Sequence, residues 1–180
     1  MEEPLSADEQ SRVLLVVGGL PGSGKTTLVR RLLAQEVSGV RGYDSEQVTE
    51  RLRRAGVRLP YRVLRPCVHA WHRLRVLRGI RGGTPVVVLT DPWTSARWRT
   101  TVQEAARDAG RRVRLVLLDA SREQAEQGQA ARGRALSARA MRRHAVRWAS
   151  ARPSLVGTEH VTTVDREAAA RLTLEELITG

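Results

Sequence analysis

The stretch "GGLPGSGKTTL" at residues 18–28 decides how this sequence folds. It follows the apolar run "VLLVV" at 13–17 and precedes "VRRLLAQ" at 29–35. A short valine-rich run is typical of a strand buried on both faces of a parallel sheet, and the leucines after the glycines recur at helical spacing. The sequence therefore predicts a strand, a glycine-rich loop and a helix that begins at Lys25.

The loop has the spacing of a phosphate-binding loop, G-x-x-x-x-G-K-[ST], between a predicted strand and a predicted helix. Its glycines let amide N–H groups point at phosphate oxygens, and the positive end of the helix favours the same anion. Lys25 would bridge the β and γ phosphates of ATP, and the Thr26 hydroxyl would coordinate the accompanying Mg²⁺. The predicted nucleotide-binding residues are Gly19, Leu20, Pro21, Gly22, Ser23, Gly24, Lys25, Thr26 and Thr27.

The charge composition makes Lys25 stand out. The chain has 31 basic and 19 acidic residues, a net charge of +12, and Lys25 is its only lysine. Because lysine is a compact point charge and arginine a broad fork, we infer that position 25 requires a lysine between phosphate oxygens. The arginines are spread over the whole chain and aromatic residues are few, so a nucleic-acid partner stays open but is not favoured.

Further strands alternate with helices after the loop. A weak strand is predicted to end at Tyr43, with a helix after it, and apolar runs follow at 86–91, 113–119 and 160–164. This alternation predicts an α/β fold with an open parallel five-stranded sheet and helices on both faces. With the phosphate-binding loop, the expected architecture is the three-layer P-loop NTPase fold.

The 180 residues are predicted to form one domain, with residues 1–11 as a flexible N-terminus. The spacing of Ser121 to Gln124 is that of a capping box, which starts a small helical lid predicted at about 121–143.

Two further helices are predicted at about 62–80 and 167–178. The first is expected to turn its arginines outward. Cys67 is the only cysteine, so an internal disulfide is excluded and a small buried side chain is expected there. The residues expected to face inward are Leu64, Cys67, Val68, Trp71 and Leu74.

Several classes of protein are excluded or disfavoured. Guanine-specific GTPases use an Asn-Lys-x-Asp motif, and this chain has no asparagine. Remodelling ATPases end a strand with Asp-Glu, whereas Asp91 precedes Pro92 and Asp119 precedes Ala120. No apolar stretch approaches the roughly 20 residues of a membrane span, and the acidic start lacks the features of a secretory signal. We therefore expect a cytoplasmic protein with no membrane partner.

Four stretches carry a resemblance to a known family: "GLPGSGKTTL" at 19–28, "GYDS" at 42–45, "VVVLTDPWTSARWR" at 86–99 and "LVLLDASREQAEQGQAARG" at 115–133. On these the sequence resembles the small P-loop kinases with an AAA-type ATP-binding domain. It is most similar to the polynucleotide-kinase-like group, and more loosely to the zeta-toxin and antibiotic phosphotransferase relatives.

The resemblance implies roles for three residues. Asp44, after the second strand, would act as general base toward the acceptor hydroxyl. Asp91, at the end of the third strand, would assist the Mg²⁺ through water, and Arg132 of the lid would cover the phosphates.

Each implied role has an alternative. Asp44 stands at capping-box spacing to Gln47 and can serve as a helix cap, with or without a role as base. Asp119 is the alternative magnesium partner to Asp91. The alternatives to the lid arginine are Arg134 and Arg139.

Other residues are open to two interpretations. Gln47 stands where polynucleotide kinases place an arginine for the acceptor phosphate, which puts recognition of a phosphorylated polynucleotide end in doubt. Trp93 and Trp98 either line an acceptor pocket or, as we favour, belong to the core. His69 and His72 are interpreted as a neutral, partly buried pair rather than metal ligands.

The expected function is ATP-dependent transfer of a γ-phosphoryl group to an acceptor hydroxyl of a small molecule or a nucleic-acid end. The alternative is an ATP-binding regulatory protein in which ATP orders the lid. The sequence identifies neither the acceptor nor the oligomeric state.

Overall fold

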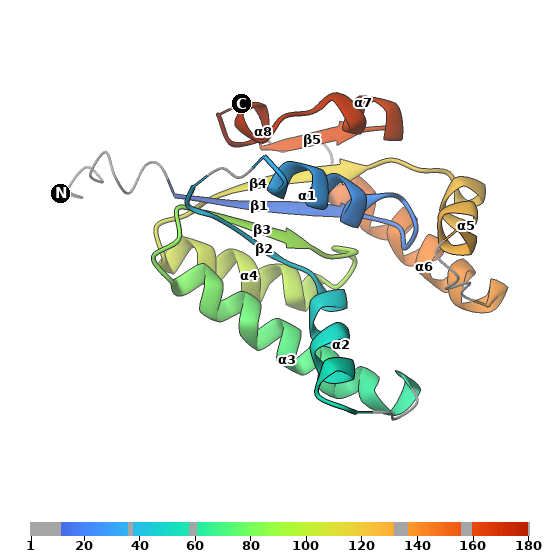
Figure 1. Ribbon diagram of the computed structural model, residues 1–180. Coiled ribbons are helices and arrows are strands. Elements are labelled where there is room, and N and C mark those ends of the chain that lie inside the picture. The colour runs from blue at the N-terminus through green and yellow to red at the C-terminus, as the bar shows by residue number, and fades with distance from the viewer. Residues whose placement is uncertain (1–11, 36–37, 58–60, 132–136, 156–159, 180) are drawn as a thin grey trace.

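Strand β1 (Val13–Gly19) lies at the centre of the sheet in the computed structural model of the protein, which describes residues 12–35, 38–57, 61–131, 137–155 and 160–179 (Figure 1). The strand order is β2-β3-β1-β4-β5, and every neighbouring pair is parallel. The predicted open parallel five-stranded sheet is therefore confirmed. The other strands are β2 (Val40–Tyr43), β3 (Val86–Thr90), β4 (Arg112–Leu118) and β5 (Val161–Val164).

Strand β1 is buried along its whole length. Its side chains alternate between two cores: Leu14 and Val16 pack in one, while Leu15 and Val17 pack in the other. A strand with two covered faces needs apolar residues at successive positions, which explains the continuous run.

Helices cover both faces and complete the three layers that the sequence predicts (Figure 1). On one face lie α1 (Lys25–Leu33), α7 (Arg166–Arg171) and α8 (Leu174–Thr179). The opposite face is covered by α3 (Tyr61–Arg81), α4 (Ala96–Asp108) and α6 (Ala138–Ala151), which leads into the short 3-10 helix Arg152–Ser154.

Two helices lie toward the carboxyl ends of the strands, α2 (Ser45–Arg54) and α5 (Arg122–Ala130) (Figure 1). The predicted capping box at the start of α5 is present, because Ser121 and Gln124 exchange hydrogen bonds. The segment predicted as a lid comprises α5 and the start of α6. Its residues 132–136 lie outside the described part of the chain, as do residues 1–11.

The predicted inward face of α3 is wrong at three positions. Cys67, Trp71 and Leu74 are exposed, whereas the buried face follows Val68 and His72 and continues through Val76 and Ile80. Helix α3 has apolar residues on two sides. Its buried side includes His72, which is polar and therefore does not contribute to an apolar pattern. Apolar spacing alone therefore did not identify the side that packs on the sheet.

The predicted helix at 167–178 is two helices. Leu172 is extended, and Thr173 begins α8 by exchanging hydrogen bonds with Glu176. This reciprocal pairing is a capping box, which starts a new helix in the middle of a continuous helical pattern. No helix in the described part of the chain is long and apolar enough to span a membrane.

Arg111 stabilises the end of the sheet that lies opposite the phosphate-binding loop. Its buried guanidinium donates hydrogen bonds to the carbonyls of Ile80 at 2.5 Å, Gly82 at 2.8 Å and Pro85 at 3.0 Å. One side chain thus joins the start of β4 to the turn between α3 and β3.

Replacing Arg111 with methionine should lower the free energy of unfolding by about 3 kcal/mol, because three carbonyls lose a charged donor. Arg111→Lys should recover only part of the loss, since an ammonium cannot span the three acceptors. The measurement is urea unfolding, with the exposed neighbour variant Arg112→Ala as the control. Equal stability of the Arg111 and Arg112 variants would contradict this role.

Candidate functional site

The loop between β1 and α1 takes the conformation that its glycines allow. Gly24 precedes the first residue of α1 with φ of 111°, and Gly22 has φ of 88°. A side chain at Gly22 would also collide with α5, since a Cβ there would lie 2.1 Å from the carbonyl oxygen of Ala125. The predicted strand, loop and helix, with the helix beginning at Lys25, are confirmed.

Lys25 lies across the loop. Its Nζ donates hydrogen bonds to the carbonyl oxygens of Gly19 at 2.8 Å and Leu20 at 2.7 Å. These bonds hold the ammonium beside the first turn of α1, where backbone N–H groups point outward from the helix end. The combination concentrates positive charge at one point, as an anion-binding loop requires.

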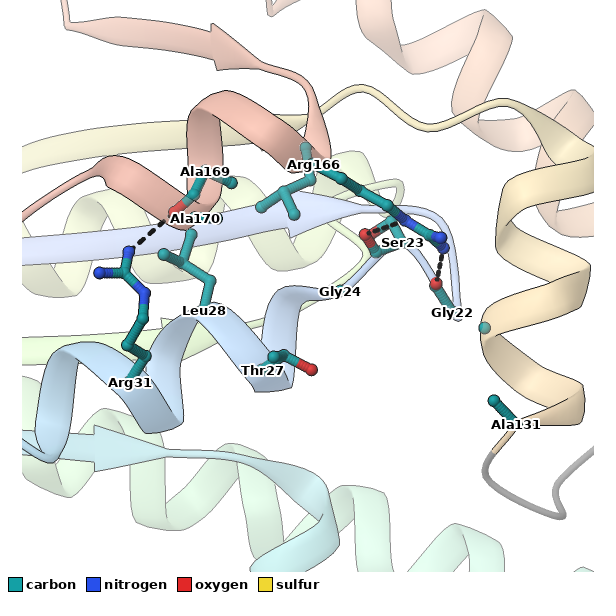
Figure 2. Close-up of a pocket in the computed structure, with 12 residues that line it drawn as sticks. Gly22, Ser23, Gly24, Thr27, Leu28, Arg31, Ala131, Arg166, Ala169 and Ala170 are labelled. Atoms are coloured by element: carbon teal, nitrogen blue, oxygen red, sulfur yellow. Dashed lines mark hydrogen bonds between the residues drawn. The ribbon is translucent and has the colours of Figure 1, made fainter.

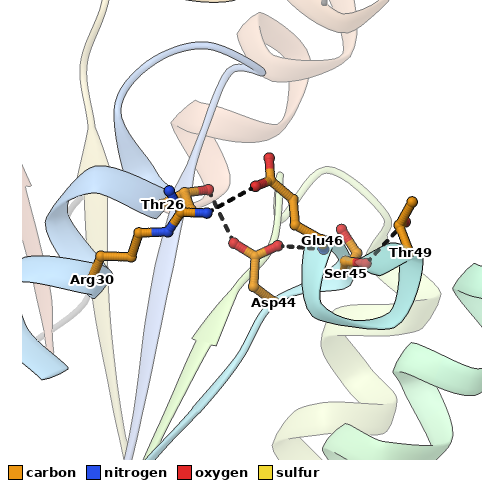
Figure 3. Close-up of polar contacts among 6 residues, drawn as sticks. All are labelled: Thr26, Arg30, Asp44, Ser45, Glu46 and Thr49. Atoms are coloured by element: carbon orange, nitrogen blue, oxygen red, sulfur yellow. Dashed lines mark hydrogen bonds and ion pairs between the residues drawn. The ribbon is translucent and has the colours of Figure 1, made fainter. Parts of the chain in front are cut away.

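Thr26, the next residue of α1, meets Asp44 at the end of β2 (Figure 3). The Thr26 hydroxyl donates to Asp44 Oδ2 at 3.0 Å, and Asp44 Oδ1 accepts from the backbone N–H of Glu46 at 2.8 Å. The predicted capping box with Gln47 does not form, because Gln47 Nε2 donates instead to the carbonyl of Gly42. Asp44 therefore caps α2 with one carboxylate oxygen and contacts Thr26 of α1 with the other.

Asp91 follows β3, which pairs directly with β1. Its Oδ1 accepts the backbone N–H of Trp93 at 2.7 Å, in a turn that gives Trp93 the rare φ of 58°. Burial raises the pKa of Asp91, opposed by the Trp93 N–H, by the positive charges of Lys25 and Arg73 and by a hydrogen bond with the Trp98 side chain. Asp91 is thus placed on the same side of the sheet edge as the loop lysine.

The remaining predicted site residues are the alternative carboxylate Asp119 and the lid arginines Arg132, Arg134 and Arg139. Asp119, the alternative to Asp91, is paired with Arg152 at 2.6 Å. Arg132 and Arg134 lie outside the described residues, and Arg139 is exposed on α6. Within the described ranges, no three His, Cys, Asp or Glu side chains gather to hold a metal ion.

A cavity of about 370 Å³ opens on the other side of the loop (Figure 2). It lies between the loop, α1, α5 and α7, and its size is within the range of small-molecule sites. Its walls are mainly apolar, with two arginines. The lining residues are Gly22, Ser23, Gly24, Thr27, Leu28, Arg31, Leu118, Gly128, Ala131, Arg166, Ala169 and Ala170.

Arg166 of α7 holds the loop from this cavity (Figure 2). Its guanidinium donates to the carbonyls of Gly22 at 2.6 Å and Ser23 at 3.2 Å, and to that of Gln124 in α5 at 2.5 Å. Because a trans peptide points its N–H opposite to its C=O, holding the Ser23 carbonyl directs the N–H of Gly24 away from Arg166. A single side chain thus joins the loop, α5 and α7.

Residues 14–155 match the protein family described as AAA domain. The chain belongs to this family. A search of curated protein sequences found no match.

Three solved structures illustrate the fold that this AAA domain protein shares. A gluconokinase from Sinorhizobium meliloti 1021 has a TM-score of 0.57 and 16% identity, covering 93% of this chain and 88% of that one. Chaetomium thermophilum Kti12 in complex with ADP-AlF3 has a TM-score of 0.62 and 19% identity, covering 93% and 100%. The tunicamycin resistance protein of Deinococcus radiodurans has a TM-score of 0.54 and 15% identity, covering 93% and 91%. The small P-loop kinase-like fold that the sequence resembles is therefore confirmed.

Sequence reasoning missed Arg166. Arginine is the common basic residue of this AAA domain chain, so one more arginine gives no local signal. Its partners Gly22 and Ser23 lie more than 140 positions away in the sequence, at separations of 144 and 143. Only the fold brings α7 against the loop.

Replacing Arg166 with alanine should speed amide hydrogen exchange in residues 20–25 by about tenfold or more, because each charge-assisted bond contributes on the order of 1.5 to 3 kcal/mol. The measurement is hydrogen exchange followed by NMR or mass spectrometry. Arg171→Ala is the matched control, since Arg171 lies on the same helix, is exposed and pairs only with Glu167 among the described contacts. Unchanged amide exchange in the Arg166 variant would show that the loop keeps its conformation without the hydrogen bonds of Arg166.

Proposed function

We propose that this AAA domain protein is a kinase that transfers the γ-phosphoryl group of Mg-ATP to the hydroxyl of a bound acceptor. The observation that carries the proposal is the contact between Thr26 and Asp44 beside Lys25. It places a carboxylate next to a phosphate-binding loop, and a phosphoryl transferase uses a carboxylate there to accept a proton. A gluconokinase among the structures with this fold supports the assignment.

The triphosphate would lie on the loop, held by backbone N–H groups and Lys25. The cavity beside Arg166 would take the nucleoside, because it adjoins the loop and its walls are mainly apolar. The complex of Kti12 with ADP-AlF3 supports a nucleotide in this fold.

The hydroxyl and carboxylate oxygens near the loop are suitable ligands for Mg²⁺ and its coordinated water. Mg²⁺ binds hard oxygen ligands and usually keeps several waters and substrate phosphates, so it needs few protein ligands. Thr26 can offer a hydroxyl lone pair while it donates its hydrogen to Asp44, and Asp91 can hold a coordinated water. The ion would neutralise charge on the phosphates and orient them.

Asp44 would act as the general base. It has one carboxylate oxygen on the helix cap and one on Thr26, and the second faces the loop. As the acceptor oxygen bonds to the γ-phosphorus, the bond to the bridging oxygen of ADP breaks and the hydroxyl proton passes to Asp44. Lys25 and the loop N–H groups stabilise the charge on the transferred group.

Asp44→Asn should lower kcat by about 10² to 10⁴ while leaving Mg-ATP affinity within a few fold, because asparagine still caps a helix but cannot accept the proton. The assay is transfer of labelled γ-phosphate to nucleosides, 5′-hydroxyl oligonucleotides, sugars and aminoglycoside-like alcohols. Asp108→Asn, at the exposed end of α4, controls for the loss of a carboxylate.

Full transfer activity in the Asp44→Asn variant would show that Asp44 serves only as the N-cap of α2. A protein that binds Mg-ATP but labels none of these acceptors would instead favour the regulatory alternative.

A further inference from the structure

We propose that the outer side of α3 is a docking surface for an acidic amphipathic helix of a partner protein. Five exposed residues form this surface, which we call the outer stripe: Val63, Cys67, Ala70, Trp71 and Leu74. The proposal goes beyond the kinase function and does not depend on it.

The outer stripe is a second apolar side of α3. Its residues recur at spacings of three and four, so they lie above one another along about three helical turns, roughly 17 Å. A different side of α3 packs on the sheet, where Val68, His72 and Val76 are buried. A surface helix normally has polar residues opposite its buried side, so a second apolar side indicates a second contact.

Exposed apolar side chains are concentrated on the outer stripe. Among the residues that the structure describes, four large apolar side chains are exposed, and one of them, Val146, lies on α6. The other three belong to the outer stripe: Val63 is 61% exposed, Trp71 44% and Leu74 47%. Single exposed apolar residues are common, whereas a contiguous group marks an interaction site.

Neighbouring helices contact the two flanks of the outer stripe. On one flank, Arg75 donates a hydrogen bond to Oε1 of Gln47 in α2 at 3.3 Å. On the other flank, the guanidinium carbon of Arg73 lies 4.9 Å from the centre of the Trp98 ring in α4. The outer stripe itself faces away from the sheet, on a helix at the outside of the molecule (Figure 1).

The charge of α3 indicates the chemistry of the partner. Helix α3 contains six arginines and no aspartate or glutamate over its 21 residues. Four of these arginines are exposed: Arg65, Arg73, Arg78 and Arg81. An amphipathic helix with acidic flanks would cover the apolar residues and pair its carboxylates with the guanidinium groups. Charges beside an apolar seam select the partner of a coiled coil in the same way.

Two other occupants fit the outer stripe less well. A second copy of this chain would bring the arginines of α3 against the same arginines, and like charges oppose that contact. An anionic membrane would attract the arginines, but Cys67 and Ala70 in the middle of the stripe offer little apolar area for insertion. Small side chains instead allow the axis of a second helix to come close.

Two synthetic helical peptides test the proposal on the full chain. Each has about three heptads with leucine at the a and d positions, and one carries glutamate at e and g where the other carries lysine. Like charges at e and g keep each peptide from pairing with itself. Calorimetric titration measures the affinity, and the NMR signal of the Trp71 indole, assigned with Trp71→Phe, shows where the peptide binds.

The glutamate peptide should bind and shift the Trp71 signal, and the lysine peptide should do neither. Leu74→Glu should weaken binding of the glutamate peptide by about tenfold or more, because it places a carboxylate in the apolar contact. Val146→Glu makes the same change of charge at an exposed aliphatic residue of α6 and should leave the affinity within about twofold. Because Leu74 is exposed, Leu74→Glu should keep the wild-type midpoint of urea unfolding.

The proposal is overturned if the glutamate peptide does not bind, if both peptides bind equally, or if Leu74→Glu and Val146→Glu bind the glutamate peptide equally. Sedimentation and flotation with phosphatidylglycerol vesicles test the other occupants, and we expect neither a dimer nor vesicle binding that depends on Leu74. A dimer that Leu74→Glu abolishes would make the outer stripe a contact between copies. Vesicle binding that Leu74→Glu abolishes would make it a membrane contact, and either result would contradict the proposed partner helix.

Discussion

The peptide groups of the β1–α1 loop must turn their carbonyls outward so that their N–H bonds can face a ligand, and the rest of the site depends on that arrangement. Two cations hold the carbonyls from different sides. Lys25 binds those of Gly19 and Leu20, and Arg166 binds those of Gly22 and Ser23. Glycines at positive φ make this backbone path accessible without steric strain.

The strand order then brings different chemistry to the two sides of the loop. Because β3 pairs with β1 and β2 pairs with β3, the residues that follow them, Asp91 and Asp44, arrive on one side. On the other side, α5 and α7 form the apolar cavity with Arg166. In the proposed function, the nucleoside and the acceptor would therefore lie on opposite sides of Lys25, the arrangement that an in-line transfer requires.

Local patterns in the sequence predicted much of the fold. The apolar run of β1, the loop spacing and the capping box at Ser121 each act over a few residues, so each could be recognised in the chain. The division of 167–178 into two helices was missed because Thr173 and Glu176 form a cap within a pattern that otherwise continues. The inward face of α3 was mistaken because His72 occupies a position on the buried side.

Long-range contacts could not be predicted in this way. Arg111 and Arg166 each bind three carbonyls that are far away in sequence, and neither differs in local context from the surface arginines. The contact between Thr26 and Asp44 likewise depends on how β2 lies relative to α1. The roles of Lys25, Asp44 and Asp91 in catalysis remain predictions that the geometry accommodates.

The central claim is that Lys25 and the loop bind the phosphates of a nucleotide, and calorimetric titration with ATP tests it most directly. Wild-type protein should bind ATP more tightly with magnesium than without it. Lys25→Ala should lose about tenfold or more in affinity, and Lys25→Arg should not restore it, because the fork does not fit between the phosphates. Equal affinity of wild type and Lys25→Ala for Mg-ATP would contradict the account.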